Sequence, residues 1–79
     1  MSFLDVQERF AASLVTLREE RNMTIDEFCE FCGIGKSSYD YYVRQGGMPT
    51  LYTAMVIADR LSLTLDQLLS AGERRGKRG

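Results

Sequence analysis

Apolar residues recur every three or four positions through most of this 79-residue sequence, and that spacing restricts the chain to packed α-helices. In the first segment the repeat predicts a helix over residues 3–21, whose apolar stripe is formed by Phe3, Val6, Phe10, Leu14 and Leu17. The alternation of period two that marks a β-strand is absent from the sequence. We therefore expect an all-α fold.

Residues that begin and end helices divide the chain into short segments. Thr24 precedes Glu27 by three residues, the capping-box spacing that opens a helix, and Gly33 stands where a left-handed C-terminal cap is expected. Gly33-Ile34-Gly35 forms a tight turn, after which residues 36–44 are predicted as a third helix. Two short helices joined by a turn of three or four residues that contains glycine are typical of a helix-turn-helix.

The second half of the chain follows the same pattern. Residues 45–49 hold two glycines and the only proline, so they form a loop, and Thr50 supplies the N-cap of a fourth helix. Thr64 and Gln67 repeat the capping-box spacing. They open a short fifth helix around Leu65, Leu68 and Leu69.

We expect Gly72 to end the folded part, which gives one domain over residues 1–72 and a mobile basic tail over residues 73–79. The net charge of −1 conceals an asymmetry between these parts. Residues 1–72 carry six basic and ten acidic side chains, whereas residues 73–79 carry four basic and one acidic. The body is therefore acidic, although a basic surface is the usual sign of nucleic-acid binding.

Several function classes find no support in the sequence. No apolar run is long enough to span a bilayer and no signal-peptide pattern opens the chain, so the expected location is the cytoplasm. Cys29 and Cys32 have no histidine and no second cysteine pair to complete a zinc site, so we expect buried core cysteines, with oxidative sensing as the alternative. Residues 33–37 superficially resemble the end of a phosphate-binding loop, but that motif requires a glycine at position 30, where this chain has Glu30. We expect no enzyme activity, cofactor, metal or small-molecule ligand.

Four stretches of the sequence follow a known pattern: Leu17-Arg18 through Thr24, Gly33-Ile34, Pro49-Thr50-Leu51, and Ile57 through Leu69. Together they resemble the lambda-repressor-like, or XRE, family of DNA-binding domains over residues 14–69, and the last stretch is the most specific. The resemblance implies a five-helix domain that places the helix of residues 36–44 in the major groove of double-stranded DNA.

The site residues are carried over from the resemblance position by position. Base-edge contacts are implied for Lys36, Ser37 and Tyr41. Phosphate contacts are implied for Ser38 and Arg44. The helical phase sends Tyr39 and Tyr42 into the core and leaves Tyr41 exposed, which agrees with a reading role for Tyr41.

The sequence also departs from the family pattern. Ile25 replaces a glutamine that contacts the DNA backbone, and Val43 replaces the glutamate that pairs with Arg18, so that Arg18 either pairs elsewhere or reaches toward DNA. Gly46-Gly47 replaces a basic loop and leaves free backbone amides, of which that of Gly46 is a candidate phosphate contact. These changes weaken the electrostatic part of DNA binding.

Two hypotheses follow. The first is a sequence-specific regulator of transcription, such as a repressor, that binds a two-fold symmetric operator as a homodimer. Its candidate dimer contacts are apolar residues of the fifth helix or of the N-terminus, such as Phe3 and Leu4. The second is a protein-interaction module, antirepressor or antitoxin-like, that keeps the fold without strong DNA binding. The acidic body, Ile25 and the uncharged loop motivate it.

Overall fold

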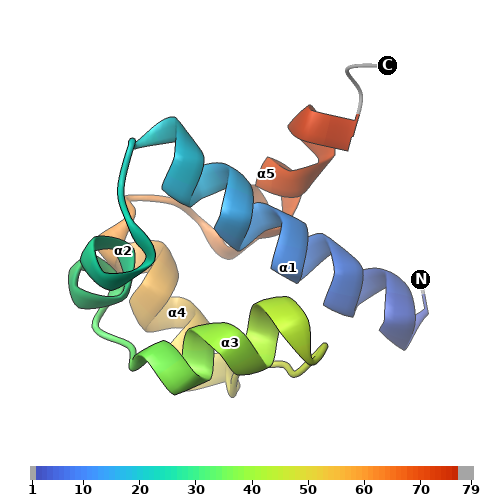
Figure 1. The fold of residues 1–79 in the computed structure, drawn as a ribbon. Coiled ribbons are helices and arrows are strands. Elements are labelled where there is room, and N and C mark those ends of the chain that lie inside the picture. Colours follow the sequence, from blue (N-terminus) through green and yellow to red (C-terminus); the bar gives the residue numbers. More distant parts are fainter. Residues whose placement is uncertain (1, 77–79) are drawn as a thin grey trace.

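The computed structural model describes residues 2–76, which form five helices and no strand (Figure 1). The helices are α1 (Phe3–Glu20), α2 (Ile25–Cys32), α3 (Lys36–Arg44), α4 (Leu51–Arg60) and α5 (Leu65–Gly76). The predicted all-α fold is confirmed. Within the described range, no helix combines the length and the apolar character needed to cross a membrane.

Local side-chain contacts hold the helix ends at the predicted positions. The Thr24 hydroxyl accepts a hydrogen bond from the Glu27 amide at 3.1 Å, and the Glu27 carboxylate accepts one from the Thr24 amide at 2.9 Å. Thr64 and Gln67 make the same reciprocal pair at the start of α5. Gly33 ends α2 with a φ of +74°, which glycine adopts without strain. These predicted caps are confirmed.

The core forms where α1 packs against the other helices. Figure 1 shows α1 crossing the front of the molecule above α3, with α5 passing close to it. The buried apolar side chains are Phe10, Leu14, Leu17, Phe28, Cys29, Cys32, Tyr39, Tyr42, Ile57, Ala58, Leu61, Leu68 and Ala71. Edge-to-face aromatic contacts join Phe10 to Tyr42 and Phe28 to Tyr39, with ring centroids 5.4 Å and 6.0 Å apart. Both α1 and α2 therefore hold α3 in place.

The sequence predicted that Gly72 ends the folded part, but α5 continues through this residue to Gly76. Gly72 lies where α5 comes closest to α1. A Cβ atom at this position would stand 2.9 Å from the Ser13 amide nitrogen and 3.0 Å from the Arg9 carbonyl oxygen. The Ser13 hydroxyl accepts a hydrogen bond from the Gly72 amide at 2.9 Å and donates one to the Leu69 carbonyl at 3.0 Å. Glycine is needed here for close packing of two helices rather than for a cap.

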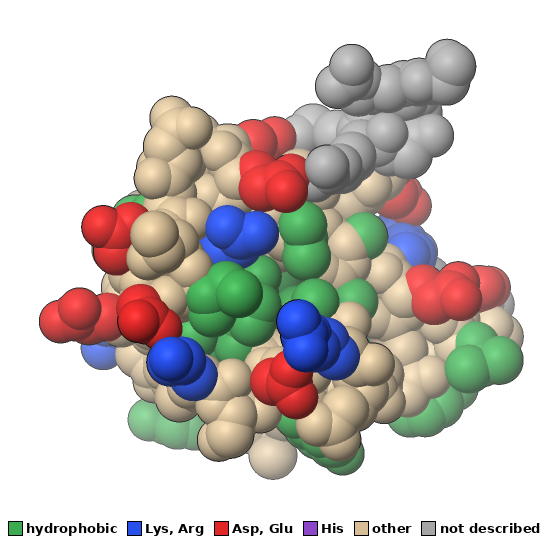
Figure 2. All heavy atoms as spheres, viewed as in Figure 1, with side chains coloured by type: hydrophobic (Ala, Val, Ile, Leu, Met, Phe, Trp, Pro, Cys, Tyr) green, Lys and Arg blue, Asp and Glu red, His purple; other side chains and the backbone are tan. Residues whose placement is uncertain are grey.

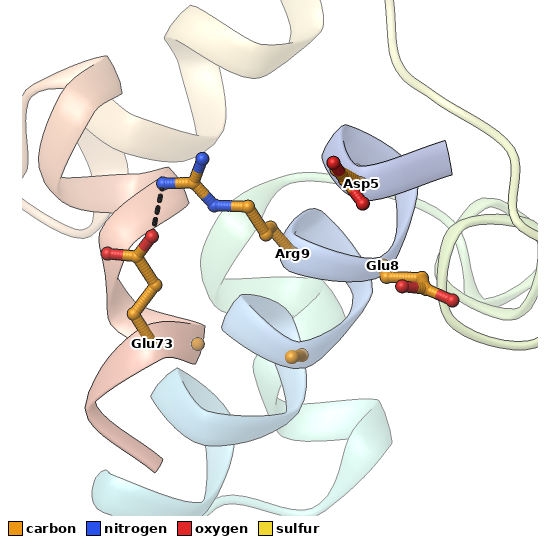
Figure 3. Close-up of a pocket in the computed structure, with 6 residues that line it drawn as sticks. Asp5, Glu8, Arg9 and Glu73 are labelled. Carbon is orange, nitrogen blue, oxygen red and sulfur yellow. Dashed lines mark ion pairs between the residues drawn. The ribbon is translucent and has the colours of Figure 1, made fainter. Parts of the chain in front are cut away.

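An ion pair continues the contact between α1 and α5 beyond Gly72. Arg9 Nη2 lies 2.7 Å from Glu73 Oε2. Figure 3 shows Arg9 reaching from α1 toward Glu73 on α5, beside a surface depression that Asp5 and Glu8 also line. The first residue of the predicted tail is therefore helical and paired with α1, and residues 77–79 of that tail lie outside the described residues.

Cys29 and Cys32 lie on the buried face of α2 with free thiols, which confirms that they are core residues. Burial raises the pKa of both thiols, and that of Cys32, which the neighbouring Cys29 raises further, reaches about 11. The reactive thiolate is therefore disfavoured at neutral pH. The described residues contain no group of three or more side chains that could hold a metal ion.

We expect the free energy of unfolding to fall as the pH rises from about 9 to about 11. A thiol in the unfolded chain ionises near its ordinary pKa of 9.0, whereas the folded Cys32 thiol keeps its proton until about 11, so unfolding releases a proton in this window and not below it. Urea unfolding across this range measures the slope. The Cys32→Ala variant isolates the contribution of this thiol, and an equal slope in this variant would contradict the prediction.

Candidate nucleic-acid interface

The helix-turn-helix unit consists of α2, the turn of residues 33–35, and α3 (Figure 1). The Ile34 amide donates to the Cys29 carbonyl at 3.0 Å, and the extended backbone of Gly35 leads into the first turn of α3. The Phe28 ring of α2 packs on the Tyr39 ring of α3. The short turn and this aromatic contact fix α3 against α2, and they leave one face of α3 at the surface.

The exposed face of α3 carries the side chains that the resemblance assigned to DNA. Tyr39 and Tyr42 are buried whereas Tyr41 is 49% exposed, which confirms the predicted phase of the helix. The other exposed candidates are Lys36, Ser37 and Arg44, while Ser38 and Gly46 are half-buried. The three candidate base readers thus lie on one surface helix, and their contact with DNA stays a prediction.

The loop after α3 supports the Tyr41 ring, a contact that the sequence analysis missed. Gly47 lies so close to this ring that the ring atoms occupy the space of a Cβ atom at position 47. The Gly47 amide donates to the Tyr41 carbonyl at 2.9 Å, so the expectation of a free amide is wrong for Gly47. Gly46 has a φ of +74° and its carbonyl accepts a hydrogen bond from the Gln7 amide group. Phosphate binding by Gly46 stays a prediction.

Arg18 pairs inside the protein, which decides between the two alternatives that the sequence left open. Its Nε donates to the Tyr39 hydroxyl at 3.0 Å, and its Nη1 donates to the Met23 carbonyl at 3.0 Å. A tyrosine hydroxyl of α3 therefore takes the place of the family's glutamate, whose position is Val43. A buried phenol needs a polar partner, and Arg18 lies on the facing helix, but only the packing of α1 on α3 brings the two groups together.

The two cations of the α3 surface are already paired with carboxylates. Lys36 Nζ lies 3.0 Å from Asp26 Oδ1, and Arg44 Nε lies 3.5 Å from Asp40 Oδ1. The second Asp40 oxygen accepts a hydrogen bond from Gln45 at 2.9 Å. Figure 2 shows acidic and basic side chains interspersed on the face that carries α1 and α3, without a continuous basic area. The spacing of four residues between Asp40 and Arg44 was a signal for one of these pairs.

A family model described as helix-turn-helix matches residues 14–68, which is more than half of the chain. The match runs from within α1 to within α5 and includes the whole α2–turn–α3 unit. The chain matches no curated protein and no solved structure. The matching family consists of DNA-binding regulatory domains and is not typically enzymatic. The chain therefore belongs to the XRE, or lambda-repressor-like, helix-turn-helix family.

Proposed function

We propose that this protein is a transcriptional regulator that binds a specific sequence of double-stranded DNA with α3 in the major groove. The observation that carries the proposal is the exposed face of α3 within a helix-turn-helix unit whose two helices are joined by aromatic packing. An α-helix fits the major groove, where each base pair presents a distinct set of donors and acceptors. A reading helix has to be held rigidly for its side chains to discriminate between bases.

Each candidate residue has a chemically reasonable role on DNA. Lys36 can donate to guanine, Ser37 can donate or accept, and the Tyr41 ring can contact a thymine methyl group or form a hydrogen bond through its hydroxyl. Phosphate contacts are assigned to Ser38, Arg44 and the Gly46 amide. Two of the three base readers are neutral, so base recognition would depend on shape and hydrogen bonding more than on charge.

We further propose that the regulator binds as a homodimer on a two-fold symmetric operator, because a single α3 reads only a few base pairs. Phe3 and Leu4, expected as dimer contacts, are exposed at 67% and 68%. In α5, Leu68 is buried and cannot contact a second copy of the chain, although Leu65 is partly accessible. The outer side of α4 adds a further apolar group with Leu51, Tyr52 and Met55.

Selection of random duplex DNA by the purified protein, read by sequencing, tests the function. We expect a two-fold symmetric motif, and we expect Tyr41→Ala to weaken binding to it by about 1–3 kcal/mol, the contribution of one good base contact. Phe31→Ala, which removes an exposed aromatic residue from the neighbouring helix α2, should leave the motif and the affinity unchanged. No enrichment at low salt would argue against DNA binding.

The alternative of a protein-interaction module is supported first by the pairing of Lys36 and Arg44 with carboxylates. An apolar surface between α1 and α3, lined by Ala11, Ala12, Val15 and Val43, also gives a protein partner something to bind. Replacing Lys36, Tyr41 and Arg44 together by alanine separates the two functions. DNA binding should be lost if α3 reads bases, whereas binding to a protein partner on the α1–α3 surface should persist.

A further inference from the structure

Two aspartates stand among the DNA-reading candidates, and neither belongs to the set of residues that the resemblance assigned. Lys36, Asp40 and Arg44 are spaced by four residues, so they share one stripe of α3. Asp26 approaches the same stripe from the first turn of α2, where it pairs with Lys36. Each cation of this stripe is therefore adjacent to a carboxylate.

The charges of the helix-turn-helix unit are unusual for a surface that meets DNA. Residues 25–44 contain two basic residues, Lys36 and Arg44, and four acidic ones. Nonspecific binding depends almost entirely on cations that replace the counterions of phosphates. A phosphate that pairs with Arg44, or a guanine or phosphate that pairs with Lys36, has to displace a carboxylate, and that carboxylate also repels the DNA backbone. Ser37 and Tyr41 are neutral, and their contacts to base edges carry no such penalty.

We propose that Asp26 and Asp40 are specificity-determining residues that suppress binding to arbitrary DNA, an inference that rests on the proposed function. In the free protein these aspartates form ion pairs with Lys36 and Arg44, so neither cation adds much to the affinity for a random duplex. An operator that fits Ser37 and Tyr41 obtains its affinity from base contacts and tolerates the acidic residues. The aspartates thus raise the ratio of specific to nonspecific affinity, which is the quantity that matters in a genome.

The fold does not depend on these carboxylates, so neutral variants can test the inference. Both ion pairs are in contact with solvent, with side-chain exposures of 69% and 71% for Lys36 and Asp26 and of 79% and 45% for Arg44 and Asp40, and such surface pairs contribute little to stability. Asp66→Asn is a matched control. Asp66 follows the Thr64 cap of α5 by two residues, as Asp26 follows the Thr24 cap of α2, and its replacement changes the net charge by the same amount.

The experiment measures binding of Asp26→Asn, Asp40→Asn and the double variant to a random-sequence duplex by fluorescence anisotropy over a range of salt concentrations. We expect each single variant to bind about threefold more tightly and the double variant about tenfold, with the slope of log K against log salt steeper by about 1 for each aspartate removed. Asp66→Asn should bind like the wild type. Affinity for the selected motif should rise by less than affinity for the random duplex.

The outcomes separate this inference from the proposed function. If the wild type enriches a motif while both aspartate variants bind random duplex no more tightly than Asp66→Asn, the inference is overturned and the function stands. If Asp40→Asn binds random duplex more weakly, Asp40 orients Arg44 toward a DNA phosphate, and the inference is also overturned. If the wild type enriches no motif and no variant gains affinity, both are overturned. Circular-dichroism melts confirm that each variant is folded.

Discussion

Replacing Phe28 by alanine should lower the free energy of unfolding by about 3–5 kcal/mol. The Phe28 side chain is fully buried and contacts the Tyr39 ring edge to face, so its removal leaves a cavity between α2 and α3 and costs one aromatic contact. A domain of this size has a total stability of about 4–12 kcal/mol. The variant should therefore lose between a quarter and nearly all of its stability, as measured by urea denaturation followed by far-ultraviolet circular dichroism.

Phe31→Ala supplies the control within the same helix. Phe31 is 41% exposed, so its removal takes less apolar surface from the core, and we expect a loss of no more than about 1 kcal/mol. The comparison removes the contribution of helix propensity, because both variants exchange phenylalanine for alanine in α2. Equal losses in the two variants would show that the contact between α2 and α3 is not what stabilises the helix-turn-helix unit.

The second large effect is expected at Gly72, where alanine should destabilise the protein by about 1–3 kcal/mol. In an unpacked helix the same change stabilises by about 1 kcal/mol, because alanine has the higher helix propensity. The packing of α5 on α1 makes the same change destabilising at position 72. An added Cβ atom would stand 2.8 Å from the Ala12 Cβ and within 3.0 Å of backbone atoms of Ser13 and Arg9, so the two helices have to separate.

Gly35→Ala is the control for this prediction. Gly35 has a φ of −81°, and a Cβ atom there would meet only the Ser37 hydroxyl, at 3.9 Å. We expect its stability to change by less than about 1 kcal/mol in either direction, since this backbone conformation suits any residue. Thermal unfolding of both variants measures the difference. A Gly72→Ala protein that melts at or above the wild-type temperature would disprove close α1–α5 packing at this glycine.

The two expected effects concern different parts of the molecule and bear on function in different ways. Phe28 joins α2 to α3, so its loss would disorder the surface proposed to read DNA. Gly72 lies between α5 and α1, where it contacts Ser13 and Arg9 of α1 rather than α3. A mildly destabilised Gly72→Ala protein should therefore still select the same DNA motif at low temperature.

The amino-acid sequence by itself determined where the capped helices begin, where α2 ends, and which faces of the helices are buried. The capping pairs Thr24 with Glu27 and Thr64 with Gln67 lie within one helical turn, so the interacting groups are close whatever the rest of the chain does. The phase that buries Tyr39 and exposes Tyr41 follows from 3.6 residues per turn. These features were predicted correctly because their causes are local.

The tertiary structure alone decided the features that depend on how the helices are placed against one another. Gly72 has the signature of a helix end, and only the approach of α1 shows that it is a packing residue inside α5. The same holds for Arg18 on the Tyr39 hydroxyl and for Lys36 on Asp26, pairs that are far apart in sequence or belong to different helices. Their interactions depend on the distance and angle between helices, which the core sets and a local repeat does not encode.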